Sequence, residues 1–253
     1  MYTLKFHLSM KKYFSLIFLF ACLQSLQSQE SIIGQWKIDF LISLWYNQVE
    51  DHQEYNLYNV AQSDERTFDW GNWMSFNPDG TFISYYTAPC GNDCFPNVYG
   101  QFKLLDDDRV LLHVDSILIG GFCKNEQFYP NKDLGVFKIF PTDSGFKLIK
   151  SEASLGSDSE NLAYSQLIDS FEWNGSNAGK QNQLNWVPLK SNSLTDLMKG
   201  LGKVTGYDTA KIRILYSKHL AASKAVLFEY NGEKRFAFYY PHALQFAIFD
   251  DPL

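Results

Sequence analysis

Hydrophobic and polar positions alternate around short turn motifs over much of this chain, which predicts antiparallel β-structure. In the segment 74–86 the alternation flanks Asn77-Pro78-Asp79-Gly80, which has the residue preferences of a type I turn. Two further hairpins are predicted, one joining 100–105 to 109–114 and one joining 136–140 to 146–149. Three successive hairpins with short turns indicate a mainly β protein built on an antiparallel meander.

The C-terminal part carries the strongest hairpin motif of the chain, Asn231-Gly232 between two strand-like segments, 225–230 and 233–240. Asn-Gly favours a two-residue type I′ turn, and such a turn fixes which residues lie opposite one another. The predicted cross-strand pairs are Glu229 with Lys234, Leu227 with Phe236 and Ala225 with Phe238. A closing strand is expected within 242–249.

Between these β regions the chain becomes rich in Ser, Asn and Gly, and we expect a long connection over 151–192. Apolar residues at helical spacing predict a helix within 158–171. A second short helix is expected to start after Ser193 as N-cap and to end near Gly202. The pattern therefore predicts a β domain over 31–150 and an α+β extension over 151–253, which either folds separately or belongs to the same domain.

Residues 1–28 have the layout of a bacterial export signal. Lys11 and Lys12 precede an apolar stretch, 13–22, that is too short for a stable membrane span, and a Gln/Ser-rich tail follows. Leu19-Phe20-Ala21-Cys22 resembles a lipobox, in which the cysteine is lipidated, although Phe20 departs from that pattern. The rival is ordinary cleavage after Ser28. The protein is thus expected to be exported, and either secreted or held in the periplasm or at the outer membrane.

Composition narrows the classes of partner. The 253 residues include 22 basic and 28 acidic side chains, a formal net charge of −6, and loss of the export segment with its three lysines would lower it to −9. An acidic chain without a basic run argues against nucleic acid as a partner and against electrostatic binding to anionic lipid. Attachment to a membrane is therefore expected only through a lipid on Cys22. The sequence does not indicate an oligomeric state.

Export makes a disulfide the expected state of the cysteines that remain, Cys90, Cys94 and Cys123. Cys90 and Cys94 could close a small loop on themselves, or one of them could join Cys123. A zinc site made by the three cysteines with His113 is the alternative, but its spacing fits no standard zinc pattern. We expect no metal site and no cofactor.

Three motifs follow one another in an order that is typical of a known family. They are Gly34-Gln35-Trp36 on a first strand, Asp79-Gly80-Thr81-Phe82 in a hairpin, and the strands from 100 to 114. This order resembles the lipocalin-like proteins exported by Bacteroidota-type bacteria, over about residues 31–150. The resemblance implies a β-barrel whose closed end is plugged by Trp36, and binding of a small apolar ligand. The chain departs from a minimal lipocalin in an insert at 44–67 and in its C-terminal extension.

No catalytic motif with useful spacing is found, and no catalytic activity is expected. The histidines are far apart in sequence, and His113 is expected to face away from the core side chains Val110, Leu112 and Val114. Aromatic side chains are the best candidates for a ligand site: Trp36, Trp70, Trp73, Tyr86 and Phe102. Two functions follow, a binding protein for a small apolar ligand or an envelope interaction protein with a filled β core.

Overall fold

The computed structural model describes residues 32–43, 49, 52–60, 70–89, 92–123, 125–151, 155–173, 187–189, 194–220, 223–240 and 244–249. The export segment with Cys22 lies outside the described residues, as do Cys90 and Ser193. The chain divides into two units, Met1–Gly34 and Gln35–Leu253, and all that follows concerns the second.

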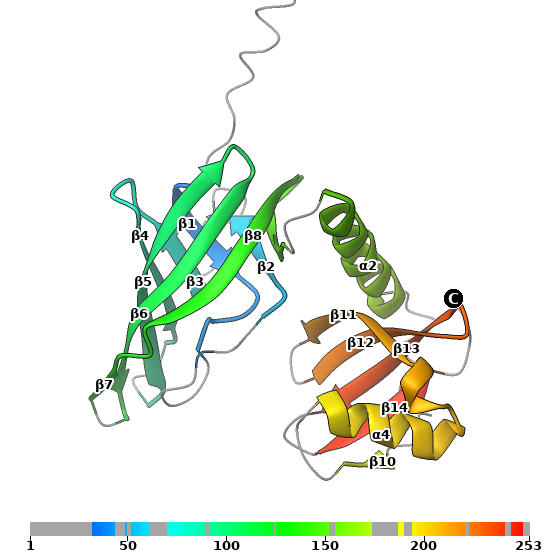
Figure 1. Ribbon diagram of the computed structural model, residues 1–253. Helices are drawn as coiled ribbons and strands as arrows, with labels where there is room; N and C mark the ends of the chain where they lie inside the picture. Colours follow the sequence, from blue (N-terminus) through cyan, green and yellow to red (C-terminus); the bar gives the residue numbers. More distant parts are fainter. Residues whose placement is uncertain are drawn as a thin grey trace, which may run out of the picture. The chain divides into compact units, whose positions relative to one another are not determined.

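Nine strands form the first sheet (Figure 1). They are β1 (Gly34–Ile38), β2 (Glu54–Asn59), β3 (Gly71–Phe76), β4 (Thr81–Thr87), β5 (Cys94–Asp106), β6 (Arg109–Gly121), β7 (Glu126–Phe128), β8 (Lys132–Thr142) and β9 (Gly145–Lys150). Their order is β5-β4-β3-β1-β2-β9-β8-β6-β7, and β6 also pairs with β5. Eight antiparallel strands thus close into a barrel, with β7 as an extra strand on β6, which confirms the expected barrel.

The strand order differs from a simple meander at one place. From β3 onward the barrel strands follow the chain, but β2 is inserted between β1 and β9, so β1 has β2 and β3 as neighbours. The segment 44–67, expected to be an insert, therefore supplies a barrel strand. Its pattern, Glu-Tyr-Asn-Leu-Tyr-Asn, alternates like a strand, but nothing local in it specifies β9 as its partner.

The predicted hairpins of the barrel are confirmed. In the β3–β4 turn Gly80 has a positive φ of 84°, its backbone N–H donates to the carbonyl of Asn77 at 3.1 Å, and Phe76 pairs with Phe82. The other two hairpins are β5–β6 and β8–β9, with strands longer than the sequence pattern suggested.

The inner face of the barrel is filled by its own side chains. Strand alternation places Phe76 and Phe82 on the same face as Val98, and cross-strand pairs extend this face to the other strands. Val110, Leu112 and Val114 are fully buried, as expected, and His113 points away from them. The largest fully buried side chains of the barrel are Tyr55, Leu57, Met74, Phe76, Phe82, Leu112 and Phe137.

The second sheet has five antiparallel strands, in the order β10-β14-β13-β12-β11. They are β10 (Val187–Pro188), β11 (Arg213–Leu220), β12 (Ser223–Tyr230), β13 (Glu233–Tyr240) and β14 (Gln245–Phe249). All three predicted pairs of the β12–β13 hairpin are present. Asn231 and Gly232 both have positive φ, 51° and 86°, as a type I′ turn requires.

A helix covers each face of this second sheet. Helix α2 (Leu155–Trp173) packs Ile168 against a cluster that contains Leu227 and Phe236, and this cluster also includes Ile149 of β9. Helix α4 (Leu194–Thr205) packs Leu197 and Leu201 on the opposite face. Neither helix in the described part of the chain is long and apolar enough to cross a membrane.

Helix α4 continues beyond Gly202, where the sequence predicted its end. A Cβ at Gly202 would lie 2.5 Å from Thr209 Cγ2, so this glycine allows a close approach of the following segment. The helix ends instead before Gly206, which has a φ of 73° and whose N–H donates to the carbonyl of Gly202 at 3.0 Å. Gly206 therefore has the left-handed conformation typical of a helix C-terminus.

Candidate functional site

One end of the barrel, the turn end, carries three tight turns. Because neighbouring strands are antiparallel, the turns at 77–80, 107–108 and 143–144 all lie there. Trp36 meets Phe146 edge to face with ring centroids 5.2 Å apart, and Phe102 meets Phe76 in the same way at 5.1 Å. Trp36 and Phe102 therefore pack among the side chains that fill this end.

The opposite end, the loop end, carries the longer connections 39–53, 88–93 and 122–131. Tyr86 lies here, opposite Asn72 in the β3–β4 ladder, and stacks on Phe95 with ring centroids 6.0 Å apart. Trp70 precedes β3 at this end and is 42% exposed. Partly accessible aromatic side chains thus occur at the loop end.

Trp73 lies on the outer face of the barrel, where other parts of the protein cover it and leave only 2% of it exposed. It alternates with Met74, whose side chain is buried inside, and its Nε1–H donates to the hydroxyl of Thr87 at 3.2 Å. The ammonium group of Lys37 lies 5.1 Å from the Trp73 ring centroid. The structure therefore does not gather the five candidate residues into one place: two are at the turn end, two at the loop end, and Trp73 is outside.

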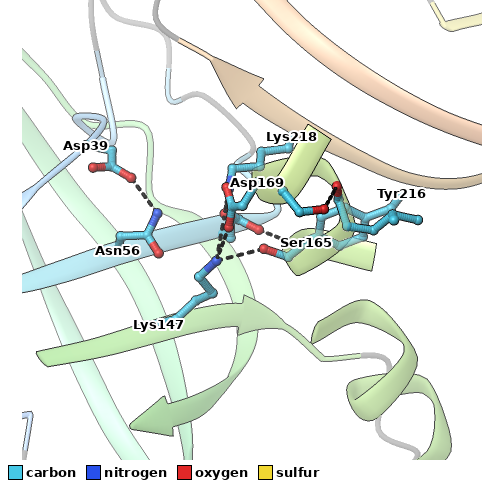
Figure 2. A network of polar contacts seen from close by, with 10 residues as sticks. Asp39, Asn56, Lys147, Ser165, Asp169, Tyr216 and Lys218 are labelled. Carbon is cyan, nitrogen blue, oxygen red and sulfur yellow. Dashed lines mark hydrogen bonds and ion pairs between the residues drawn. The ribbon is translucent and has the colours of Figure 1, made fainter. Parts of the chain in front are cut away.

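A cluster of charged side chains, which the sequence did not reveal, joins β2, β9, α2 and β11 (Figure 2). The Nζ of Lys147 lies 2.9 Å from Asp169 Oδ2 and 2.8 Å from the Ser165 hydroxyl. The Nζ of Lys218 lies 2.8 Å from Glu54 Oε1 and also pairs with Asp169. The hydroxyl of Tyr216 donates to Glu54 Oε2 at 2.8 Å.

The four charges balance one another. Burial alone would raise the pKa of Asp169, but hydrogen bonds from Lys218 and Lys147 outweigh it, so this pKa is lowered. Burial alone would lower the pKa of Lys218, but Glu54 and Asp169 outweigh it, so this pKa is raised. Burial, followed by the charge of Glu54, raises the pKa of Tyr216, which keeps its proton as a donor. Two ammonium groups therefore face two carboxylates.

This cluster is unsuited to catalysis despite the contact between Lys147 and Ser165. A lysine that activates a serine must be neutral, whereas the ammonium group of Lys147 forms ion pairs with Asp169 and Glu54. Ser165 is fully buried, so no substrate could reach its hydroxyl. The arrangement instead holds four elements together. The sequence feature that could have indicated this cluster is Lys147, a charged residue within a strand whose neighbouring residues are buried on both faces.

A second polar group lies on the outer face of β2. The side-chain amide of Asn56 donates to Asp39 Oδ2 at 2.5 Å (Figure 2). Burial, with the neighbouring Asp39 carboxylate as the next cause, raises the pKa of Tyr58. Tyr58 is therefore a neutral hydrogen-bonding group at neutral pH.

Cys94 and Cys123 form a disulfide, with Cα atoms 5.1 Å apart, so one of the expected pairings is present. His113 is not near them: its Nε2 lies 3.0 Å from Asn131 Oδ1 and its Nδ1 2.5 Å from Asp133 Oδ1. Within the described ranges, no three His, Cys, Asp or Glu side chains form a group that could hold a metal ion.

No family model matches this chain, and no curated protein or solved structure was found to match it. The resemblance to exported lipocalin-like proteins thus stays a prediction. Function has to be argued from the barrel and its side chains.

Proposed function

We propose that this protein is an exported, lipocalin-like binding protein that holds a small apolar ligand at the loop end of its barrel. The asymmetry of the barrel supports this proposal. Three tight turns and the Trp36–Phe146 contact lie at the turn end, whereas longer connections and the partly buried Tyr86 lie at the loop end. Small-molecule sites occur preferentially in the mouths of β-barrels.

The filled middle of the barrel limits how deep the ligand can lie. Phe82, Leu112 and Phe137 have essentially no exposed surface, so they contact other protein atoms on all sides. A ligand would therefore lie close to Tyr86 and to Phe95, which stacks on that ring. Trp70 is at the same end, because it precedes Gly71, which pairs with Thr87. Its chemistry would be small, apolar and able to stack on aromatic rings.

Export rests on residues 1–28 and is supported by the Cys94–Cys123 disulfide, since such bonds persist in oxidising compartments. Lipidation of Cys22 would tether the protein to a membrane, whereas cleavage after Ser28 would release it.

Fluorescence titration with N-phenyl-1-naphthylamine, an apolar probe, tests the ligand site. The wild-type protein should bind the probe, and Tyr86→Ala should weaken binding by about 10-fold, because it loses roughly 1.4 kcal/mol of stacking contact. Tyr99→Ala is the matched control, since Tyr99 alternates with the inward-facing Val98 and is exposed. Absence of binding by folded protein, or equal weakening by both variants, would refute the proposed site.

A second candidate is an envelope interaction protein. Phe122 and Tyr129, which flank β7, are 76% and 71% exposed, and large exposed aromatic side chains often mark contact surfaces. Native mass spectrometry of the protein purified from its own envelope distinguishes the candidates. A small molecule retained by the protein supports ligand binding. A complex with another protein that contains no small molecule supports the second candidate. The same mass reports a lipid on Cys22.

A further inference from the structure

Two histidines that are far apart in sequence meet edge to face where the β1–β2 connection contacts β11. His52 precedes β2 and His219 lies near the end of β11, yet their ring centroids are 4.2 Å apart at an interplanar angle of 72°. Phe40 stacks on His52 at 5.7 Å and meets His219 edge to face at 6.0 Å. The contact therefore consists of one phenyl and two imidazole rings.

The rings lie in surroundings that disfavour positive charge. His52 is 1% exposed, and its Nε2 lies 3.1 Å from the carbonyl oxygen of Leu41. Lys224 pairs with His219 across the β11–β12 ladder. Burial, then His52, then Lys224 lower the pKa of His219 to about 3.

The other charged and titratable groups near these rings already have partners. Tyr55 meets the His52 ring edge to face at 5.3 Å. Glu54, two residues after His52, is bound by Lys218 and by the Tyr216 hydroxyl, and Lys218 also pairs with Asp169. The pKa of Asp169 is lowered and that of Lys218 is raised, so neither of these two groups changes its charge between pH 5 and 8. Glu50 and Asp51 precede His52 in the chain and are outside the described residues.

We propose that the edge-to-face contact of His52 and His219 is an acid-sensitive clasp, which joins the β1–β2 connection to β11 when both rings are neutral and releases it when they are protonated. Two imidazolium rings at this separation would repel each other and would also lose hydration. Opening exposes both rings to water, so the open form takes up protons that the closed form cannot hold. This device is independent of the proposed ligand site.

The expected pH dependence follows from proton linkage. Each histidine that is neutral in the closed form and free in the open form multiplies the open-to-closed ratio by up to about 10 per pH unit below its ordinary pKa of about 6.5. His219 alone therefore gives up to about 10-fold per unit. Between pH 7.5 and 5.0 the clasp should change from closed to measurably open.

Carbene footprinting of the full chain at pH 7.5 and 5.0 tests the clasp. In wild-type protein, labelling of Phe40 and of β11 should rise at least threefold at pH 5.0, while labelling of Phe238 in the core of the sheet stays constant. His219→Gln cannot take up the proton and should remove most of this rise. His219→Phe keeps a ring against Phe40, and its labelling should also be independent of pH. This variant replaces His219→Gln in the test if the glutamine variant does not fold.

His113→Gln is the matched control, because His113 lies on the outer face of β6 and is bonded to Asp133 and Asn131. This variant should respond to acid as the wild type does. The proposal is overturned if wild-type labelling is the same at both pH values, if the His219 variants respond like wild type, or if Phe238 labelling rises together with that of β11.

Discussion

Neutralising Glu54 should lower the free energy of unfolding by about 3 to 5 kcal/mol, the usual cost of removing one partner of a buried ion pair. The side chains of Glu54 and Lys218 are only 5% and 6% exposed, and their charged atoms are 2.8 Å apart. In Glu54→Gln, the amide oxygen can still accept from Tyr216, so the main change is one lost negative charge. Lys147 and Lys218 would then share the single carboxylate of Asp169.

A double-mutant cycle separates this electrostatic cost from ordinary damage to packing. Lys218→Met alone should also be destabilising, because Glu54 then becomes the excess charge. The double variant Glu54→Gln/Lys218→Met restores charge balance, so its loss should fall short of the sum of the single losses by at least about 2 kcal/mol.

Urea unfolding at pH 7, followed by tryptophan fluorescence and circular dichroism, gives these free energies, provided that the m-value stays constant. Asp106→Asn is the control: it removes an exposed partner of Arg109 and should leave the midpoint nearly unchanged. A loss below about 1 kcal/mol for Glu54→Gln, or strictly additive single losses, would show that the cluster does not behave as a buried charge network.

Three further predictions concern the barrel. Cys94→Ser should cost about 3 to 4 kcal/mol in urea unfolding, the chain-entropy value for a disulfide with a sequence separation of 29, and Cys123→Ser should cost the same. Gly100→Ala should cost about 1 to 3 kcal/mol, because the new Cβ would lie 2.2 Å from the backbone oxygen of His113. The hydrogen bond that His113 donates to Asp133 raises the pKa of His113, so the stability that this contact contributes is present below the ordinary histidine pKa and is lost as pH rises. Asp133→Asn should therefore destabilise the protein more at pH 5.5 than at pH 8.5.

Each of these predictions has a clear contrary result. Unequal losses for the two cysteine variants would mean that one cysteine has a role outside the disulfide. A neutral Gly100→Ala would mean that β5 and β6 can separate locally without cost. An equal effect of Asp133→Asn at both pH values would mean that the His113 contact does not depend on the charge of the imidazole.

The local parts of the fold could be predicted because turn chemistry specifies them. The register of the β12–β13 hairpin follows from Asn231-Gly232 alone, and the β3–β4 hairpin follows from its Asn-Pro-Asp-Gly turn. The position of β2 could not be predicted, since a strand's alternation shows which face is buried but does not identify its neighbour. The sequence predicted the end of α4 at Gly202, but the helix ends before Gly206. A glycine that allows close packing, such as Gly202, cannot be distinguished by sequence alone from a glycine that ends a helix, such as Gly206.

The candidate sites were harder to predict than the hairpins. Alternation places Trp73 on the opposite face from Met74, but the sequence does not say which face of the strand points inward. The ionic cluster brings together Glu54, Lys147, Asp169 and Lys218 from four elements, so no motif of fixed spacing could reveal it. The sequence shows that charged residues occur within strands that are otherwise apolar, but it does not show which residues they pair with.

The insertion of β2 between β1 and β9 has a consequence for how the barrel assembles. Glu54 pairs with Ile149, so β2 can complete its hydrogen bonds only after almost the whole barrel sequence is available. The hairpins from β3 to β9 form from neighbouring segments, whereas closure requires contacts of large sequence separation, which are the slow ones in folding. Until then β2 exposes an unpaired strand edge, and the newly made chain is most prone to aggregate at that stage.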